Sequence, residues 1–296
     1  KTVNSLSGGK TSSYIAANYP ADYNVFALVT TENPKSLYPD SKVRQMVSDK
    51  IGREFIGTLE FNEIINTMLD LEQFIGQKIN WISEHNFEDV VRRKKMLPNV
   101  SQRFCTIELK INPIAQWCYD NTELPTEYRF GFRANEMRRA KNMMARIQED
   151  GFIYHKFKIG EKNGRNKWKE LKYYKPKFPL IEDNIYKDSI DEYWKGKPVR
   201  FAYMNNCIGC FHRNEILLKH ISNKAPNKFD TFIDIENLGA DIREKSRKDR
   251  GIHFDKSKDK WSTFKEQTYE NIKNHKSQIK LFDDDFNECD SGYCGL

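Results

Sequence analysis

A glycine pair near the start of the chain lies between a short apolar segment and a helical pattern. Residues 2–6 predict a strand, Gly8 and Gly9 a turn, and residues 10–16 the start of a helix. Two adjacent glycines allow successive backbone N–H groups to point at one anion. The helix start adds unpaired N–H donors and the positive end of its dipole. The stretch therefore predicts a phosphate-binding loop, whose contacting residues would be Ser7, Gly8, Gly9, Lys10, Thr11 and Ser12.

This loop is not a Walker A loop, although Gly9, Lys10 and Thr11 match the last three positions of that motif. A Walker A loop requires a glycine five residues before Gly9, and this chain has Asn4 there. A phosphate loop of another kind is one interpretation. A glycine turn without a chemical role is the alternative.

The composition indicates a polar protein with a polyanionic partner. The chain has 296 residues, enough for one large or two modest domains, of which 38% are hydrophobic and 31% charged. No apolar run approaches about 20 residues and no signal-peptide pattern is present, so we expect a cytoplasmic protein without a membrane partner. The formal net charge of +7 favours a nucleotide or a nucleic acid as partner. Six cysteines in such a chain are more typical of metal binding or catalysis than of disulfides.

Alternating strand and helix patterns predict an α/β fold with a doubly wound parallel sheet. The expected elements after the first helix are strands at 24–30 and 53–57 and helices at 39–50 and 61–74. We expect a nucleotide-binding domain over residues 1–150, followed by a cysteine-bearing extension over residues 151–296.

Thr31 and Glu32 follow the strand predicted at residues 24–30. Ligands of such sheets bind beyond the carboxyl ends of the strands. These two side chains would then lie beside the glycine loop and contact adenine or ribose. A polar strand exit without a ligand is the alternative.

Three separate blocks resemble one protein family. The glycine loop is similar to the pyrophosphate loop Ser-Gly-Gly-x-(Asp/Thr)-Ser of the adenine-nucleotide α-hydrolase superfamily, with Thr11 where many members have aspartate. Residues 103–113 resemble the motif Arg-Phe-Cys-Thr-x-Glu-Leu-Lys-x-x-Pro of the phosphoadenosine-phosphosulfate (PAPS) reductase-like family, particularly its phage-type members. Residues 129–139 resemble its Gly-x-Arg-x-x-Glu-x-x-Arg block. The resemblance implies a Rossmann-like nucleotide-binding fold.

The same resemblance implies an enzyme that binds ATP with magnesium and forms an adenylate with release of pyrophosphate. Lys10, Lys110, Arg133 and Arg139 would neutralise charge on the phosphates, and Glu136 would belong to the nucleotide site. Guanidinium groups suit this role because they can clamp phosphate or sulfate through two parallel hydrogen bonds. Arg138 would point to solvent.

Cysteines supply the second expected centre. Cys105 lies in the middle block, and Cys207 and Cys210 form a Cys-x-x-Cys turn that can grip one metal ion or cluster. The resemblance implies that the three converge near the α-phosphate and hold a 4Fe–4S cluster for sulfur chemistry, or Zn²⁺, with a fourth ligand from Cys289, Cys294 or His212. The alternative is a buried Cys105 and a structural zinc knuckle. Cys118 is expected in the core.

The C-terminal tail keeps other functions open. Cys294-Gly295-Leu296 resembles the tail that carries the catalytic thiol of PAPS reductases, which makes Cys294 a candidate nucleophile. A PAPS or APS reductase that releases sulfite is therefore one alternative. A nucleotide sensor or interaction module without catalysis is another.

Residues 155–177 alternate basic and aromatic side chains. This pattern predicts a hairpin turning at Asn163 and Gly164, and it is typical of surfaces that place cations on phosphates and rings on bases. A nucleic acid, tRNA or DNA, is thus a candidate substrate, and a second copy of the chain is the remaining candidate partner.

Overall fold

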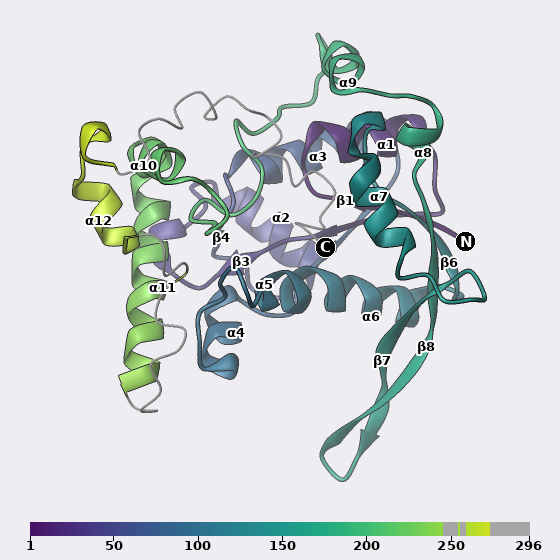
Figure 1. The fold of residues 1–296 in the computed structure, drawn as a ribbon, viewed down its shortest axis with the longest axis horizontal. Coiled ribbons are helices and arrows are strands. Elements are labelled where there is room, and N and C mark those ends of the chain that lie inside the picture. The colour runs from purple at the N-terminus through teal and green to yellow at the C-terminus, as the bar shows by residue number, and fades with distance from the viewer. Residues whose placement is uncertain (245–253, 255–258, 273–296) are drawn as a thin grey trace.

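The computed structural model describes residues 1–244, 254 and 259–272. A six-stranded sheet in the order β5-β2-β1-β6-β8-β7 forms its centre (Figure 1). Every neighbouring pair is parallel except β7 and β8. The strands are β1 Thr2–Leu6, β2 Tyr23–Ala27, β5 Ile79–Ile82, β6 Thr126–Arg129, β7 Ile153–Lys162 and β8 Arg165–Lys177. The predicted α/β class with a mostly parallel sheet is confirmed.

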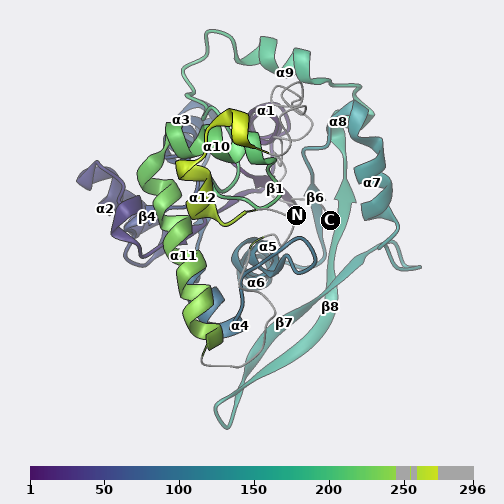
Figure 2. The same cartoon turned by 60° about the vertical axis from the view of Figure 1, so that its left-hand side comes forward.

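Helices cover both faces of this sheet. Leu6 and Phe26 pack on one face against α1, α2, α3 and α9, whereas Val3 and Val25 pack on the other against α6 and α7. A third core gathers α4, α10, α11 and α12 (Figures 1 and 2). The helices are α1 Lys10–Asn18, α2 Ser41–Ile51, α3 Glu63–Ile75, α4 Phe87–Lys94, α5 Phe104–Thr106, α6 Asn112–Asn121, α7 Met137–Met144, α8 Pro179–Glu182, α9 Lys187–Trp194, α10 Glu215–Lys224, α11 Pro226–Glu244 and α12 Trp261–Glu266. Among the described residues, no helix combines the length and apolarity needed to cross a membrane.

Local signals account for the boundaries of α2. The Asp40 side chain accepts hydrogen bonds from the N–H groups of Lys42 and Val43, which caps the helix start. Gly52 ends the helix with a left-handed φ of 69°. The predicted helices at 39–50 and 61–74 are therefore confirmed within two residues at each end, as α2 and α3.

The strand predicted at residues 53–57 is wrong for most of its length. Only Gly57–Thr58 (β4) is a strand, and it pairs with Thr30–Thr31 (β3) in a separate two-stranded sheet. The Arg53 guanidinium instead donates to Ser83 and Asn86, at the end of β5. These hydrogen bonds to residues far away in the sequence hold the segment at Arg53 outside the main sheet.

The hairpin predicted around Asn163 and Gly164 is confirmed. Both residues have positive φ, 53° and 71°, as a two-residue hairpin turn requires. Strand β8, from the part expected as an extension, pairs in parallel with β6 and so belongs to the main sheet. Most of the aromatic rings of the β7–β8 hairpin are not available to stack on bases, because they are buried in the core: Phe157, Tyr173 and Tyr174.

Candidate functional site

The glycine loop has the backbone that its sequence requires. Gly8 has a left-handed φ of 79°, and a Cβ there would lie 2.7 Å from the Ile64 side chain. Gly9 is the N-cap of α1, so the loop leads directly into the helix start. The Ser12 hydroxyl closes the loop by accepting from the Ser7 N–H at 3.1 Å and donating to the Gly9 carbonyl at 3.1 Å. These hydrogen bonds fix the loop against the first turn of α1.

The sheet places this loop at its topological switch point. From β1 the chain proceeds first to β2 and β5 on one side, and then returns to β6 on the other side of β1. In such sheets a crevice opens where the strand order reverses, beyond the carboxyl ends of the strands. The segment after β6 adjoins the loop, since a Cβ on Gly131 would lie 3.4 Å from the Thr11 methyl group. The first and third sequence blocks are therefore neighbours.

Arg133, Glu136 and Arg139 form one ion cluster in this segment. Arg133 is buried, and both its backbone N–H and its Nε donate to Glu136, at 2.9 and 3.2 Å. Arg139 pairs with the other oxygen of the same carboxylate, and its guanidinium lies 4.5 Å from the Phe132 ring centre. One carboxylate orients two guanidinium groups, so the cluster keeps a net positive charge beside the loop. Arg138 is exposed, as expected.

Lys10 is held by α9, a helix for which the sequence predicted no site residue. Its Nζ lies 2.6 Å from Asp191 of α9, and the Trp194 indole donates to the Lys10 carbonyl at 3.0 Å. Helix α9 therefore covers the start of α1. These contacts span more than 180 positions, and no spacing in the sequence signals them.

Thr31 and Glu32 are engaged by other protein groups. The Thr31 hydroxyl donates to the buried Glu88, and Glu32 pairs with Arg92. Burial raises the pKa of Glu88, while the Thr31 hydrogen bond partly opposes the shift. Glu32 lines a cavity of about 290 Å³ together with Asn33, Pro34, Glu88, Arg92, Asp234, Ile235 and Leu238. None of the loop residues Ser7 to Ser12 lines this cavity.

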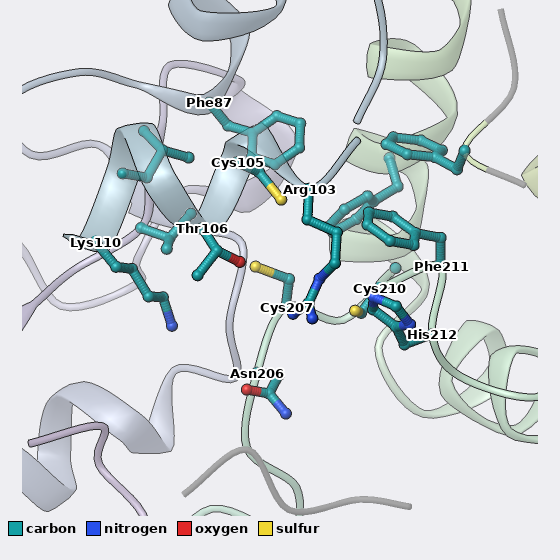
Figure 3. Close-up of a pocket in the computed structure, with 15 residues that line it drawn as sticks. Phe87, Arg103, Cys105, Thr106, Lys110, Asn206, Cys207, Cys210, Phe211 and His212 are labelled. Atoms are coloured by element: carbon teal, nitrogen blue, oxygen red, sulfur yellow. The ribbon is translucent and has the colours of Figure 1, made fainter. Parts of the chain in front are cut away.

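Cys105, Cys207 and Cys210 line one cavity of about 50 Å³ (Figure 3). Cys105 comes from α5, and the other two come from a turn in which the Cys210 N–H donates to the Cys207 carbonyl at 3.2 Å. Gly209 in this turn admits the Phe232 ring, because a Cβ there would lie 2.3 Å from it. The cavity is also lined by His212.

Cationic side chains lie near these thiols. Arg103 lines the cavity, and Arg213 is buried and donates to the carbonyls of Cys207 and Asn205. Burial raises the pKa of the Cys105 thiol to about 11 and that of Cys207 well above its usual value. The positive charge of Arg103 at Cys105 and that of Lys110 at Cys207 oppose these shifts only in part, so the pKa of both thiols stays raised.

Lys110 lies with the cysteines. It lines their cavity, and its Nζ is 3.0 Å from Glu60 Oε1. Burial alone would lower the pKa of Lys110, but Glu60 and the thiols outweigh it and the net shift is upward. Glu60 is itself a buried carboxylate that the sequence did not signal, since its partner lies 50 positions away.

Two of the remaining expected ligands, Cys289 and Cys294, lie outside the described residues. Within residues 1–244, 254 and 259–272, no group of three or more His, Cys, Asp or Glu side chains is positioned to hold a metal ion. The three cysteines therefore share a cavity without forming a closed three-ligand site. Cys118 is fully buried in the core, as expected.

Comparison with protein-family models, with curated proteins and with solved structures found no match to this chain.

Proposed function

We propose that this protein is an adenine-nucleotide enzyme of the α-hydrolase type, which binds ATP at the glycine loop, forms an adenylate and releases pyrophosphate. One observation carries the proposal: a Gly-Gly loop with a left-handed Gly8 starts a helix at the switch point of a parallel sheet. Backbone donors at such a position bind phosphate without further side chains. The magnesium ion expected with ATP would accompany the phosphates.

The side chains beside the loop suit a polyphosphate. Arg133 and Arg139 are fixed by Glu136, and Lys10 is fixed by Asp191, so the cations are oriented before a ligand arrives. Groups that are oriented in advance stabilise developing charge with little reorganisation. In this proposal they neutralise the charge that builds up on the phosphates as the α-phosphorus is attacked.

The side chains that line the cysteine cavity are of the type that binds a thiolate-ligated metal centre. Three thiols with Arg103 and Arg213 nearby match an iron–sulfur cluster or zinc, which both prefer thiolate ligands. Cys105, Cys207 and Cys210 would hold this group, which would supply sulfur or electron chemistry to the activated nucleotide or its acceptor. Lys110, which is paired with Glu60, lines the same cavity.

Pyrophosphate release from ATP tests the nucleotide reaction. We expect Arg133→Gln to lower this release by at least tenfold, because removing one preorganised cation from a transition state costs on the order of 1.4 kcal/mol or more. Arg138→Gln, an exposed neighbour on the same segment, is the matched control and should keep full turnover. Sulfite release from PAPS with a thiol reductant, in the absence of pyrophosphate release from ATP, would replace the proposal by the reductase.

Metal analysis tests the cysteine centre. Anaerobically purified protein should contain iron and sulfide in near-equal amounts, and Cys207→Ser should lose both. Cys118→Ser is the control, because Cys118 of α6 is buried in the hydrophobic core and lies outside the cavity. Zinc alone would assign the cysteines a structural role.

A further inference from the structure

The β7–β8 hairpin extends as a two-stranded arm away from the helices of the body (Figures 1 and 2). Every residue from 160 to 170 is exposed, so neither face of the outer half is covered by the described part of the protein. A two-stranded ribbon without a core is only marginally stable in water. The outer half therefore contributes little to the fold that supports it.

One face of this arm carries four cations. Side chains alternate along a strand, so Arg165, Lys167 and Lys169 share a face of β8. Lys162 is the cross-strand partner of Arg165 and joins them on that face. Within the described residues, none of these four side chains forms an ion pair. The acidic residues of the outer arm lie on the other face: Glu161, opposite Asn166, and Glu170, opposite Lys156.

This arrangement is unfavourable in the free protein. Like charges directly opposite each other on neighbouring strands destabilise the pair, and Lys162 and Arg165 are in that position. An anion bound along the face would relieve this repulsion. The charge pattern thus indicates a polyanionic ligand that lies along the ribbon.

The dimensions favour duplex DNA. Alternate residues of a strand are about 7 Å apart, which is close to twice the 3.4 Å axial spacing of phosphates on one DNA strand. The major groove of B-DNA, about 12 Å wide, admits a two-stranded ribbon, whereas the major groove of A-form RNA is too narrow for side chains. A single strand needs aromatic rings on the binding face. The exposed ring of the arm, Trp168, is on the opposite face, beside Lys158.

We infer that the cationic face, formed by Lys162, Arg165, Lys167 and Lys169, binds the backbone of double-stranded DNA. At its base the same face carries Phe157, whose ring stacks on Tyr119 of α6 at 5.2 Å. The helical run that ends in α6 begins at Phe104, and its second residue, Cys105, lies about 20 Å from Tyr119 along the helix axis. DNA on the arm would extend along this side toward the cysteine cavity. The assignment of this DNA as the acceptor of the sulfur chemistry rests on the proposed function.

The inference is tested by binding of a 20-base-pair DNA of mixed sequence to the full chain. Fluorescence anisotropy measures this binding over a series of salt concentrations, without nucleotide or turnover. Lys167→Gln/Lys169→Gln should weaken binding by on the order of tenfold or more and lower the salt slope by about 1.8, or 0.9 for each lost phosphate contact. Lys42→Gln/Lys78→Gln removes the same charge at exposed positions away from the arm and should leave both unchanged.

Two further nucleic acids and one further variant complete the test. The matching single strand and a 20-base-pair RNA duplex should bind more weakly than the DNA duplex, and Trp168→Ala should not alter duplex binding. Equal losses in the two double variants would show that net charge alone governs binding and would overturn the inference. Tighter binding of the single strand with dependence on Trp168, or of the RNA duplex, would also overturn it. Failure of pyrophosphate release would remove the proposed reaction but would not change these binding results.

Discussion

Gly8 is the residue on which the glycine loop depends most. Two separate constraints act there. Its φ of 79° is one that residues other than glycine rarely adopt, and the Ile64 side chain lies 2.7 Å from where a Cβ would be. The loop cannot keep its path if both constraints are violated. Substitution of Gly8 is therefore expected to alter the proposed phosphate site itself.

We predict that Gly8→Ala lowers ATP affinity by at least tenfold and lowers the free energy of unfolding by about 1–3 kcal/mol. Calorimetric titration with a non-hydrolysable ATP analogue and chemical denaturation measure the two effects. Gly52→Ala is the matched control, because Gly52 has a similar φ of 69° but open space around its Cβ position. It should cost only the backbone strain, about 1 kcal/mol, and leave affinity unchanged. Equal effects of both variants on affinity would contradict the prediction.

At the scale of elements, contact between α11 and α12 depends on a buried carboxylate. Glu236 of α11 is 4% exposed and accepts a hydrogen bond from the Trp261 N–H at 3.0 Å. Burial raises its pKa from 4.5 to about 7, although this hydrogen bond opposes the shift. Between these values the unfolded chain releases a proton that the folded protein retains. This group therefore makes stability fall as the pH rises from about 4.5 to 7.

Glu236→Gln should remove this dependence while keeping an acceptor for Trp261. We predict that the variant gains stability relative to the parent protein as the pH rises from 4.5 to 7, by on the order of 2–3 kcal/mol. Urea denaturation across this range measures the difference. Glu266→Gln, at an exposed position of α12, is the control and should follow the parent curve. A constant difference between Glu236→Gln and the parent protein would refute the prediction.

The elements that the sequence predicted well are those with local causes. Asp40 and Gly52 bound α2, and Asn163 with Gly164 turns the hairpin, because capping and turn geometry depend on neighbouring residues. The short strand at 53–57 was predicted wrongly because Arg53 bonds to groups about 30 positions away.

The candidate site likewise contains local features that the sequence predicts and long-range contacts that it does not. The glycine loop could be predicted, since its residues are adjacent in the chain. The pair Lys110–Glu60 and the hydrogen bond between Thr31 and Glu88 could not, because 50 and 57 positions separate the partners. A single sequence carries no local signal for such contacts, and only the folded chain brings the residues together.

At the scale of the whole molecule, one segment lies between the glycine loop and the cysteine cavity. Ile64, near the start of α3, packs at Gly8, and Glu60, just before α3, pairs with Lys110 of the cavity. Lys228 of α11 fixes this segment by donating to the carbonyls of Thr58 and Glu60 at 2.8 and 2.5 Å. Burial lowers the pKa of Lys228 to about 7, although Glu60 opposes the shift. The two sites thus share a wall that the C-terminal helices support.

A shared wall does not by itself couple the two sites, and thermal unfolding with ATP can separate them. A ligand at 100 times its dissociation constant stabilises the folded protein by about 2.7 kcal/mol, which should raise the melting temperature by about 4 °C or more. We predict this increase for the parent protein and for Cys207→Ser, and its loss in Arg133→Gln. The result for Cys207→Ser decides how the sites are related: an unchanged increase means that nucleotide binding needs only the loop and its cations, since Cys207 lies across the wall. Loss of the increase in this variant, with its fold intact by circular dichroism, would contradict the prediction and make the cysteine cavity part of the nucleotide site.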